Sequence, residues 1–431
     1  MSKMNEINNS KLCITNQKEF SCDVIEIAKK IESAGGRLYL VGGAVRDNLL
    51  GIKSVQDEDF CVVGISSEKF CEMFPTSIKR GKSFEVFDLN GKEFALARKE
   101  RKIGLGHKEF EIIANEEITI EDDLKRRDIT INAIASDVLT GEIIDPYNGI
   151  DDIKNKVIRV VSEKFKEDPL RVYRVARFAS KLDFSVEEET IKMMRELKEE
   201  LSSLSPERVF DELRKALKTN KPSKFFEVLK EADVLDVHFK EIFKLIGAEQ
   251  PIIYHPEGDA YNHTMLALDM SATLTQDEII RFCALVHDLG KGVTPKEMYP
   301  HHTGHDINGV KELENFCNRL KMPKAWLKCG KTAVREHMRA GMFSNMKKAK
   351  KVTFIESISK TMLGLDGLEI VVEADRNCRG TKKDKIEFAK IGNKMLTEIN
   401  GEFIKQKYNI SEGLQLQEKL HQERINWLKN L

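Results

Sequence analysis

Two aspartates separated by one residue are the first feature of this 431-residue chain that could do chemistry. Asp57 and Asp59 lie in the stretch QDEDFCVV, where residues 57–63 favour a β-strand. Residues i and i+2 of a strand project to the same face, so both carboxylates would point the same way. Adjacent carboxylates repel each other unless a cation lies between them, and Mg²⁺ prefers oxygen ligands. The pair therefore predicts a magnesium site that completes its shell with substrate phosphates.

A glycine pair precedes these aspartates. Gly42 and Gly43 follow the apolar run RLYLV and precede AVRDNLLG, which gives the order strand, turn, helix. Glycine lets the backbone approach phosphate oxygens closely, and the first N–H groups of a helix favour anions. Arg46 lies in the first turn of that helix and could reach the same phosphates. A lone Gly-Gly is usually a turn and a lone Asp-x-Asp a solvated pair, but together they predict a triphosphate site.

A series of charged residues marks the helix expected in EDPLRVYRVARF. Asp168, Arg171, Arg174 and Arg177 follow one another at three-residue steps, which predicts one shared helix face. Asp168 would cap the helix and Pro169 would be its first residue. A carboxylate accepts from an exocyclic amine and an arginine donates to ring acceptors, so Asp168 and Arg171 could read cytosine and adenine edges. The alternative is a capped, solvated amphipathic helix.

Histidines and aspartates gather in a second region. Six of the ten histidines fall between His263 and His337, and His287 and Asp288 are adjacent in LVHDLGK. The further candidate ligands are His301, His302, His305 and Asp375. Histidine nitrogen with carboxylate oxygen suits Mn²⁺, Ni²⁺, Fe²⁺ or Zn²⁺ better than Mg²⁺, and such a metal can activate water to attack phosphorus. Any one of these histidines alone is more often a packed or surface residue.

The elements that must position these residues change character along the chain. A helix is expected in CDVIEIAKKIESAGG, strands at 37–41 and 58–64, and a hairpin at 84–98 around Asn90-Gly91. Long helical patterns dominate after about residue 155. We therefore expect an α+β protein. Its predicted parts are a polar lead (1–18), a mixed-sheet head (19–154), a helical neck (155–229), a histidine-rich helical domain (230–395) and a helical tail (396–431).

Composition narrows the class of protein. Lys+Arg and Asp+Glu both number 70, so a nucleic-acid enzyme of this composition would need a local basic face. The eight cysteines form no C-x-x-C pair, which favours thiols in a reducing compartment. The polar N-terminus does not have the pattern of a signal peptide, and no apolar run approaches the roughly 18 residues of a membrane span. We expect a cytoplasmic protein that does not bind membranes.

Several ordered motifs resemble those of one enzyme family. LVGGAVRDNLLG, DEDF, RRDITINAIA, DPYNGIDDI, EDPLRVYRVARF and SPERVFDEL occur in that order, and the resemblance covers about residues 39–380. They are similar to the bacterial class II family of CCA-adding tRNA nucleotidyltransferases and poly(A) polymerases. One departure is Ile129, where the family commonly has phenylalanine. The resemblance implies a nucleotidyltransferase head of polymerase β type over residues 19–154.

The resemblance also implies roles for single residues. Asp57 and Asp59 match the Mg²⁺-binding catalytic pair, and Gly43 and Arg46 match the nucleotide-phosphate turn. Arg127 matches a triphosphate or ribose contact, although Arg126-Arg127 alone could equally be a surface ion-pair patch. Asp168 and Arg171 match the pair that admits CTP and ATP. Arg174 and Arg177 match further nucleotide contacts. The implied partners are tRNA, ATP and CTP.

The histidine-rich region resembles the HD phosphohydrolase superfamily. The matching pattern is H…HD…H…H…D, with His305 chosen among the middle three histidines. It consists of His263, His287, Asp288, His305, His337 and Asp375. Some CCA-adding enzymes carry such a domain at this place. The resemblance implies a transition metal such as Ni²⁺ or Mn²⁺, and a phosphatase or 2′,3′-cyclic phosphodiesterase that trims damaged tRNA ends before CCA repair.

Three alternatives to this bifunctional enzyme stay open at this point. The shared motifs do not separate CCA addition from poly(A) synthesis, although the stretch KRGKSFEVFDL (79–89) lacks the Arg-Arg-Phe run of the polymerases, and the chain lacks a long basic tail. A phosphohydrolase with a non-catalytic RNA-binding head is the second alternative. A non-catalytic RNA-binding protein is the third. Among tRNA nucleotidyltransferases themselves, an enzyme specialised for adding CC or for adding the final A also stays open.

Overall fold

The computed structural model describes residues 20–52, 58–80, 86–102, 110–113, 116–378, 387–410 and 413–431. It divides into two compact units. The first unit contains the chain up to Arg171 together with Phe184–Met193. The second contains Val172–Asp183 and the chain from Met194 onward. Each unit is described by itself. The predicted lead, residues 1–18, and Asp57 lie outside the described residues.

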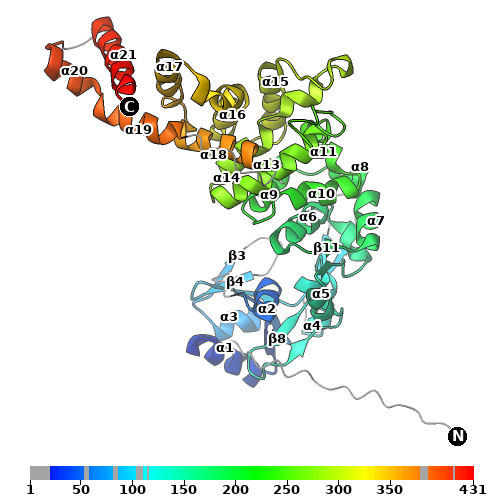
Figure 1. The fold of residues 1–431 in the computed structure, drawn as a ribbon. Helices are drawn as coiled ribbons and strands as arrows, with labels where there is room; N and C mark the ends of the chain where they lie inside the picture. Colours follow the sequence, from blue (N-terminus) through cyan, green and yellow to red (C-terminus); the bar gives the residue numbers. More distant parts are fainter. Residues whose placement is uncertain are drawn as a thin grey trace. The chain divides into compact units, whose positions relative to one another are not determined.

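A mixed seven-stranded sheet forms the centre of the first unit (Figure 1). Its strands, in spatial order, are β3 (Ile78–Arg80), β4 (Val86–Leu89), β5 (Lys92–Leu96), β2 (Asp59–Val63), β1 (Arg37–Val41), β8 (Ala135–Asp137) and β9 (Ile143–Ile144). All neighbouring pairs are antiparallel except β2 and β5, which run parallel. This parallel pairing sets Asp59 opposite Glu93, so two acidic residues meet where β2 begins.

Alternation along β2 separates the two faces of the sheet. Phe60 points to one face, where its ring stacks on Phe94 with centroids 5.1 Å apart, and Phe70 of α3 (Ser67–Met73) packs there. Cys61 points to the other face and packs in a cluster with Leu124 of α4 (Ile120–Lys125). Since Asp59 and Cys61 are two residues apart, Asp59 projects toward the α4 side.

The short elements of the head follow from local sequence. The helix α1 (Cys22–Ser33) buries Val24, Ile27, Ala28 and Ile31, which lie at helical spacing. The predicted strand 37–41 and the predicted hairpin are confirmed, with Asn90 (φ 55°) and Gly91 (φ 76°) forming the two-residue turn. The strand predicted at 58–64 is observed from Asp59 to Val63.

The remaining elements of the first unit flank the sheet. They are α2 (Gly43–Leu49), η1 (Thr130–Asn132), α5 (Gly149–Asn155), η2 (Glu163–Glu167), the hairpin β6 (Lys99–Lys102) and β7 (Phe110–Ile113), and the pair β10 (Val157–Ile158) and β11 (Ser185–Val186). The last pair is a small departure from the expectation of helices alone beyond residue 155, because the chain returns at β11 to pair with β10.

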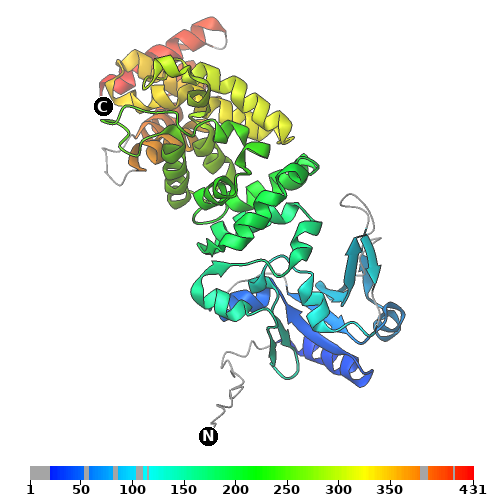
Figure 2. The ribbon, with the colours of Figure 1, turned by 90° about the vertical axis from the view of Figure 1, so that its right-hand side faces the viewer.

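Helices make up the second unit (Figure 2). Those that follow the head are α6 (Leu170–Leu182), which starts in the first unit, α7 (Glu188–Glu196), of which the residues up to Met193 belong to the first unit, α8 (Lys198–Leu201), α9 (Pro206–Leu217), α10 (Ser223–Glu231), α11 (Leu235–His238) and α12 (Lys240–Phe243). Then come α13 (Ala260–Leu274), α14 (Glu278–Val286), η3 (Leu289–Val293), η4 (Lys296–Met298), α15 (His305–Arg319), α16 (Lys324–Gly341), η5 (Phe343–Asn345), α17 (Lys348–Ile358), α18 (Gly364–Asn377), α19 (Phe388–Glu398), α20 (Gly401–Tyr408) and α21 (Leu414–Lys429).

An aromatic core and one buried arginine hold neck and histidine-rich helices together. Phe225 and Phe239 pack edge to face with centroids 5.6 Å apart, beside Tyr173 of α6. The guanidinium of Arg281, in α14, donates to the carbonyls of Leu217 and Thr219 at the end of α9, both at 2.7 Å. The same group also donates to carbonyls at the end of α13. Carbonyls that two helix ends leave without intrahelical partners are therefore satisfied by one side chain.

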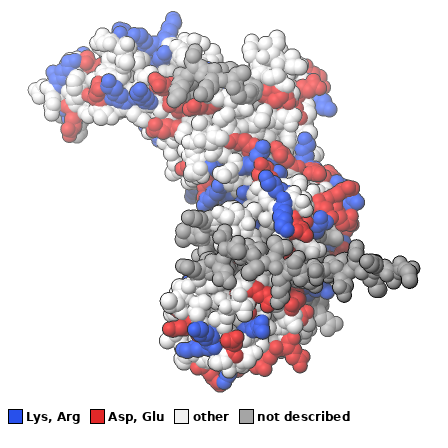
Figure 3. Space-filling view, turned by 60° about the horizontal axis from the view of Figure 1, so that its bottom comes forward, with Lys and Arg blue, Asp and Glu red and all other residues white. Residues whose placement is uncertain are grey.

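The described helices include none with both the length and the apolar character that a bilayer crossing requires. On the face drawn in Figure 3, basic and acidic side chains are interspersed where residues are described. This agrees with the equal numbers of both signs in the sequence.

Candidate functional site

A small cavity lined by acidic and basic side chains opens on the α4 side of the sheet. Asp59 and Glu93 line it from the strands β2 and β5, and Asp123, Arg126 and Arg127 line it from α4 and the residues that follow. The cavity has a volume of about 140 Å³. Glu93 was missed by sequence reasoning, since only the long-range register of β2 with β5 brings it beside Asp59. Carboxylates of this kind could hold a divalent cation facing two guanidinium groups.

One buried carboxylate, Asp123, holds both arginines. Arg126 donates to Asp123 Oδ1 through Nε at 2.9 Å and Nη2 at 2.7 Å, and Arg127 Nη2 lies 3.4 Å from Asp123 Oδ2. Burial alone would raise the pKa of Asp123, but Arg126 and Arg127 outweigh it and the pKa is lowered. The carboxylate therefore stays ionised and fixes the direction of both guanidinium groups. Arg127 Nε is buried and has no hydrogen-bond partner among the described residues, which fits a donor awaiting an anion.

The glycine turn brings the backbone against Arg127. Gly42, which precedes α2, has φ 72° and ψ −127°, a conformation that side-chain-bearing residues rarely adopt. A Cβ at Gly42 would lie 2.8 Å from Arg127 Nη1. Gly43, the glycine that the sequence singled out, is the first residue of α2. The turn thus depends on Gly42 for its shape and sets the free end of α2 beside Arg127.

Arg46 lies in the first turn of α2, as expected, but its side chain has partners inside the protein. Its residue is 1% exposed, and its guanidinium donates to the Asp47 carboxylate at 2.8 Å and to Asn132 Oδ1. Asn132 in turn donates to Asp128 Oδ1 at 3.3 Å. The Arg46 guanidinium is buried and already bound to two internal acceptors. These contacts do not favour the expected direct contact between Arg46 and the phosphates. It ties α2 to the segment after Arg127.

The helix α6 begins one residue later than predicted. Asp168 Oδ1 accepts from the N–H of Leu170 at 3.1 Å, so Asp168 caps the helix as expected, and Pro169 precedes its first residue. Arg171 donates to the carbonyls of Lys164 and Arg126, both at 2.7 Å. Its position is thereby coupled to the arginines of the cavity.

The later arginines of α6 take other partners. Arg177 Nε donates to Glu212 Oε2 at 2.5 Å, and its guanidinium lies 4.1 Å from the centroid of the Phe178 ring. Arg174 lies 5.7 Å from the same ring. Each three-residue step turns about 60° short of a full helical circle, so four residues at this spacing spread over about half the helix surface. This explains why Arg171 and Arg177 have separate surroundings.

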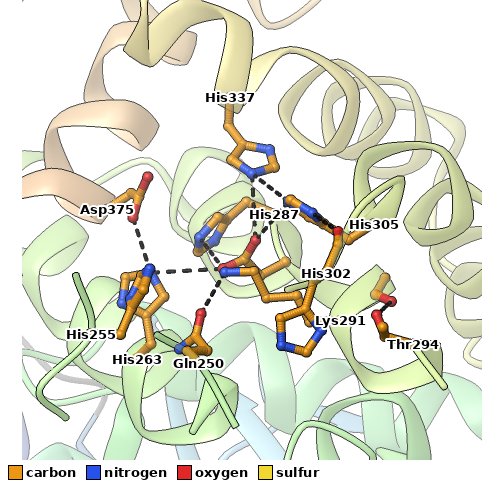
Figure 4. Close-up of polar contacts among 12 residues, drawn as sticks. Gln250, His255, His263, His287, Lys291, Thr294, His302, His305, His337 and Asp375 are labelled. Carbon is orange, nitrogen blue, oxygen red and sulfur yellow. Dashed lines mark hydrogen bonds and ion pairs between the residues drawn. The ribbon is translucent and has the colours of Figure 1, made fainter. Parts of the chain in front are cut away.

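The histidine and aspartate residues predicted as metal ligands converge in the second unit (Figure 4). His263 comes from α13, His287 and Asp288 from the end of α14, His305 from the start of α15, His337 from α16 and Asp375 from α18. His287 Nε2 lies 3.2 Å from Asp288 Oδ2, while His305 and His337 Nε2 each lie 3.4 Å from Asp288 Oδ1. His263 Nε2 lies 3.0 Å from Asp375 Oδ1.

Backbone carbonyls orient three of these imidazoles. The Nδ1 atom of His287 donates to Ala284 O at 2.8 Å, that of His305 to His302 O at 2.7 Å, and that of His337 to Val334 O at 3.0 Å. Each ring therefore presents Nε2 to the centre. His263 Nε2, His287 Nε2 and Asp288 Oδ1 are buried without a hydrogen-bond partner among the described residues, although carboxylate and imidazole atoms lie close by. Buried nitrogen and carboxylate oxygen atoms left in this state fit metal ligation through their lone pairs.

The centre offers two groups of three ligands that share Asp288. One group is His263, His287 and Asp288, and the other is Asp288, His305 and His337. Nε2 of His305 and His337 are 3.3 Å apart. Ligand atoms around a metal with bonds of about 2.0–2.1 Å lie roughly 3.3–3.5 Å from one another in tetrahedral geometry, which is the observed spacing. The residues thus fit one metal ion at each oxygen of Asp288.

Electrostatics hold the two carboxylates of the centre in the charged form. Burial would raise the pKa of Asp288, but the His287 imidazole and the Lys291 ammonium outweigh it and keep that pKa well below its usual range. Burial would likewise raise the pKa of Asp375, but the neighbouring His263 imidazole outweighs it and lowers that pKa. Both carboxylates are therefore kept ionised and can serve as metal ligands.

Three residues that sequence reasoning missed support the centre. Lys291 Nζ lies 2.6 Å from both Asp288 Oδ2 and Gln250 Oε1. Glu257 Oε1 accepts from His263 Nδ1 at 2.8 Å. The stretch HPEGDAYNH could have indicated Glu257, because a histidine and a glutamate stand shortly before His263 there. Among the candidates His301, His302 and His305, it is His305 that faces the centre, whereas His302 donates from Nε2 to Glu249 O.

Three family models match successive parts of the chain. They are the poly A polymerase head domain over residues 38–159, the probable RNA and SrmB-binding site of polymerase A over 183–246, and the HD domain over 252–376. Among solved structures, a Thermotoga maritima CCA-adding enzyme complexed with tRNA_CCA is similar at a TM-score of 0.64 and 21% identity, covering 96% of this chain and 93% of that one.

Two further solved structures are similar over nearly the full length. A Bacillus stearothermophilus CCA-adding enzyme in complex with CTP has a TM-score of 0.57 and 22% identity, covering 93% of this chain and 91% of that one. An apo CCA-adding enzyme has a TM-score of 0.63 and 20% identity, covering 96% and 97%. Likeness at this identity establishes the shared fold, and the family models establish the domain types. The chain therefore carries a poly A polymerase head domain, a segment that matches the RNA and SrmB-binding model and an HD domain, and it shares the fold of solved CCA-adding enzymes.

Proposed function

We propose that this enzyme adds the CCA sequence to tRNA 3′ ends from CTP and ATP. The observation that carries the proposal is the cavity in which Asp59 and Glu93 face Arg126 and Arg127. Carboxylates for a cation and guanidinium groups for phosphates are the two components that nucleotidyl transfer requires. The solved structures with CTP and with tRNA_CCA are of proteins that share the fold, which supports these substrates for this chain.

In the proposed mechanism the chain mainly positions the reacting groups and neutralises the charge of the phosphates. Asp57, Asp59 and Glu93 would hold Mg²⁺, which when bound lowers the pKa of the RNA 3′-hydroxyl and neutralises charge on the α-phosphate. The backbone at Gly42 and Gly43 and the guanidinium of Arg127 would hold the triphosphate. Arg46 would support this turn from within. Orientation of the hydroxyl toward the α-phosphate supplies much of the rate, and pyrophosphate leaves.

Base choice is proposed to rest on the start of α6. Asp168 would accept from the exocyclic amine of cytosine or adenine, and Arg171 would donate to the neighbouring ring acceptor. The contact of Arg171 with Arg126 O couples the base reader to the phosphate binders. Arg174 and Arg177 would assist farther along the helix, with Arg177 braced by Glu212.

We propose that the HD domain hydrolyses phosphate esters at damaged tRNA 3′ ends, as a phosphatase or 2′,3′-cyclic phosphodiesterase. His263, His287, Asp288, His305, His337 and Asp375 would hold its metal ions. Ni²⁺ or Mn²⁺ suits this mixture of nitrogen and oxygen ligands, and the bound metal supplies a water nucleophile. The seven described cysteines are free, which supports the cytoplasm as the proposed compartment.

Two variants separate the proposed activities. We expect Asp59→Ala to abolish CTP and ATP incorporation into tRNA and to retain phosphate release from a 3′-phosphorylated RNA. We expect Asp288→Ala to do the reverse. Wild-type protein that releases phosphate without incorporating nucleotides would identify a phosphohydrolase with an RNA-binding head. Absence of both activities under conditions where tRNA binds would identify a non-catalytic RNA-binding protein.

A further inference from the structure

Glu257 is the only carboxylate among the described residues that accepts a hydrogen bond from an Nδ1 atom of the proposed metal-binding imidazoles. His287, His305 and His337 donate from Nδ1 to neutral backbone carbonyls. His263 donates from Nδ1 to Glu257 Oε1 at 2.8 Å. A carboxylate partner makes an imidazole a more basic ligand than a carbonyl partner does. The four imidazoles are therefore not equivalent donors.

The position of Glu257 is itself fixed by its surroundings. Its side chain is 6% exposed, and His255 Nδ1 lies 3.0 Å from the same Oε1 atom. The rings of His255 and His263 meet edge to face with centroids 4.8 Å apart. Asn262 donates to the Glu257 carbonyl at 3.2 Å, and Asp259 caps the start of α13 through the N–H of Asn262 at 2.9 Å. The loop before α13 thus holds the carboxylate in place beside the helix that carries His263.

His255, Glu257 and His263 could also be read as a separate metal-binding triad. The spacing argues against it. Glu257 Oε1 lies 2.8 Å from His263 Nδ1 and 3.0 Å from His255 Nδ1, which are hydrogen-bond lengths. Ligand atoms around one tetrahedral metal lie roughly 3.3–3.5 Å apart. The spacings of 3.2–3.4 Å between Asp288 and the Nε2 atoms of His287, His305 and His337 match metal ligation instead. His263 Nε2 lies farther away, 3.8 Å from Asp288 Oδ2.

We propose that Glu257, held by His255, is a positioning residue that makes the metal position of His263, His287 and Asp288 the tighter of the two. This inference rests on the proposed metal centre of the HD domain. Glu257 orients the His263 ring so that Nε2 faces the centre and strengthens that nitrogen as a donor. The position of Asp288, His305 and His337 lacks such a carboxylate among the described residues and depends on carbonyls alone.

The test is a titration of the metal-free full-length protein with Co²⁺, followed by the d–d absorption bands that report ligand geometry. We expect two equivalents to bind to the wild type, one tighter than the other. Glu257→Ala should weaken the tighter position by about 10- to 100-fold and leave the weaker one unchanged. Glu257→Gln keeps a hydrogen-bond acceptor of the same size, so it should lose less Co²⁺ affinity at the tighter position than Glu257→Ala does. The Co²⁺ affinity of His255→Gln at the tighter position should lie between those of the wild type and Glu257→Ala.

Controls separate this inference from a general loss of structure. Glu297→Gln makes the same chemical change at an exposed residue of η4 and should bind Co²⁺ as the wild type does. CTP incorporation should be retained in every variant, because Glu257 lies outside the transferase cavity. Unchanged Co²⁺ binding in both Glu257 variants, or equal weakening of both positions, would overturn the inference. A wild type that binds no Co²⁺ would instead overturn the proposed metal centre, and the inference with it.

Discussion

At the scale of single residues, the transferase cavity depends on carboxylates that come from distant parts of the chain. Asp59 begins β2 and Glu93 lies opposite it on β5. Asp123 is buried beneath Arg126 and Arg127 and keeps both guanidinium groups aimed into the cavity. The two signs of charge are thus held apart by separate elements, so that a cation and a triphosphate could bind next to each other.

Removing the charge of either strand carboxylate should slow transfer while leaving the fold intact. We expect Asp59→Asn to lower CTP incorporation at least about 100-fold and Glu93→Gln at least about 10-fold, since each removes a charge that neutralises the reacting phosphate. The measurement is single-turnover incorporation at saturating Mg²⁺. Glu72→Gln, at an exposed position of α3, is the matched control. Full activity of Glu93→Gln would show that its place beside Asp59 has no role in transfer.

Protons should compete with metal at the HD centre. Burial opposes the charge on His263, but its contacts with Asp375, Cys378 and Glu257 raise its pKa well above the usual value, so a proton on this imidazole competes with a metal ion. A metal binds only the neutral ring, and therefore affinity should fall as the pH falls and rise as the pH approaches the raised pKa. Calorimetric titration with Mn²⁺ in buffers of different ionisation enthalpy checks this. A binding constant independent of pH from 6 to 8 would contradict it.

At the scale of elements, sequence reasoning worked where the signals were local. The strand at 37–41, the hairpin at Asn90-Gly91 and the Asp168 cap depend on neighbouring residues, and the structure contains all three. The burial of Arg46 and the approach of Glu93 depend on contacts with η1 and β5 far along the chain. Helical and strand periodicity contains no information about such pairings, which is why they could not be predicted.

Gly42 offers a test of the turn that precedes α2. Gly42→Ala should lose about 1–3 kcal/mol of stability because of its positive φ, and should also raise the KM for CTP because the new Cβ displaces Arg127. Gly51→Ala is a matched control, since Gly51 has φ 69° and a Cβ there meets no atom of the described residues within 4 Å. It should be destabilised similarly with an unchanged KM. Equal KM effects in both variants would contradict the proposed role of the turn.

At the scale of the whole molecule, the part of the neck from Met194 onward and the HD domain belong to one compact unit. Arg281 is a principal link, because it is completely buried and joins the ends of α9 and α13. An ion pair at 2.7 Å between Arg214 of α9 and Glu278 of α14 adds to the link. Neck and HD domain should therefore unfold together.

Arg281→Met should test this coupling. The change leaves several buried carbonyls without donors, and we expect a loss of about 3–5 kcal/mol of stability in the second unit. Urea unfolding followed by the fluorescence of Trp326, which is buried in that unit, measures the loss. Arg214→Met removes only the more exposed pair and should cost about 1 kcal/mol or less. Equal losses in both variants would contradict the assigned role of Arg281.

The most direct test of the central claim is the 3′-end sequence of the product. Purified enzyme is incubated with tRNA lacking its CCA end, all four nucleoside triphosphates and Mg²⁺, and the RNA ends are sequenced. We predict products that end uniformly in CCA. A long run of adenosines would identify a poly(A) polymerase and contradict the proposed substrate choice.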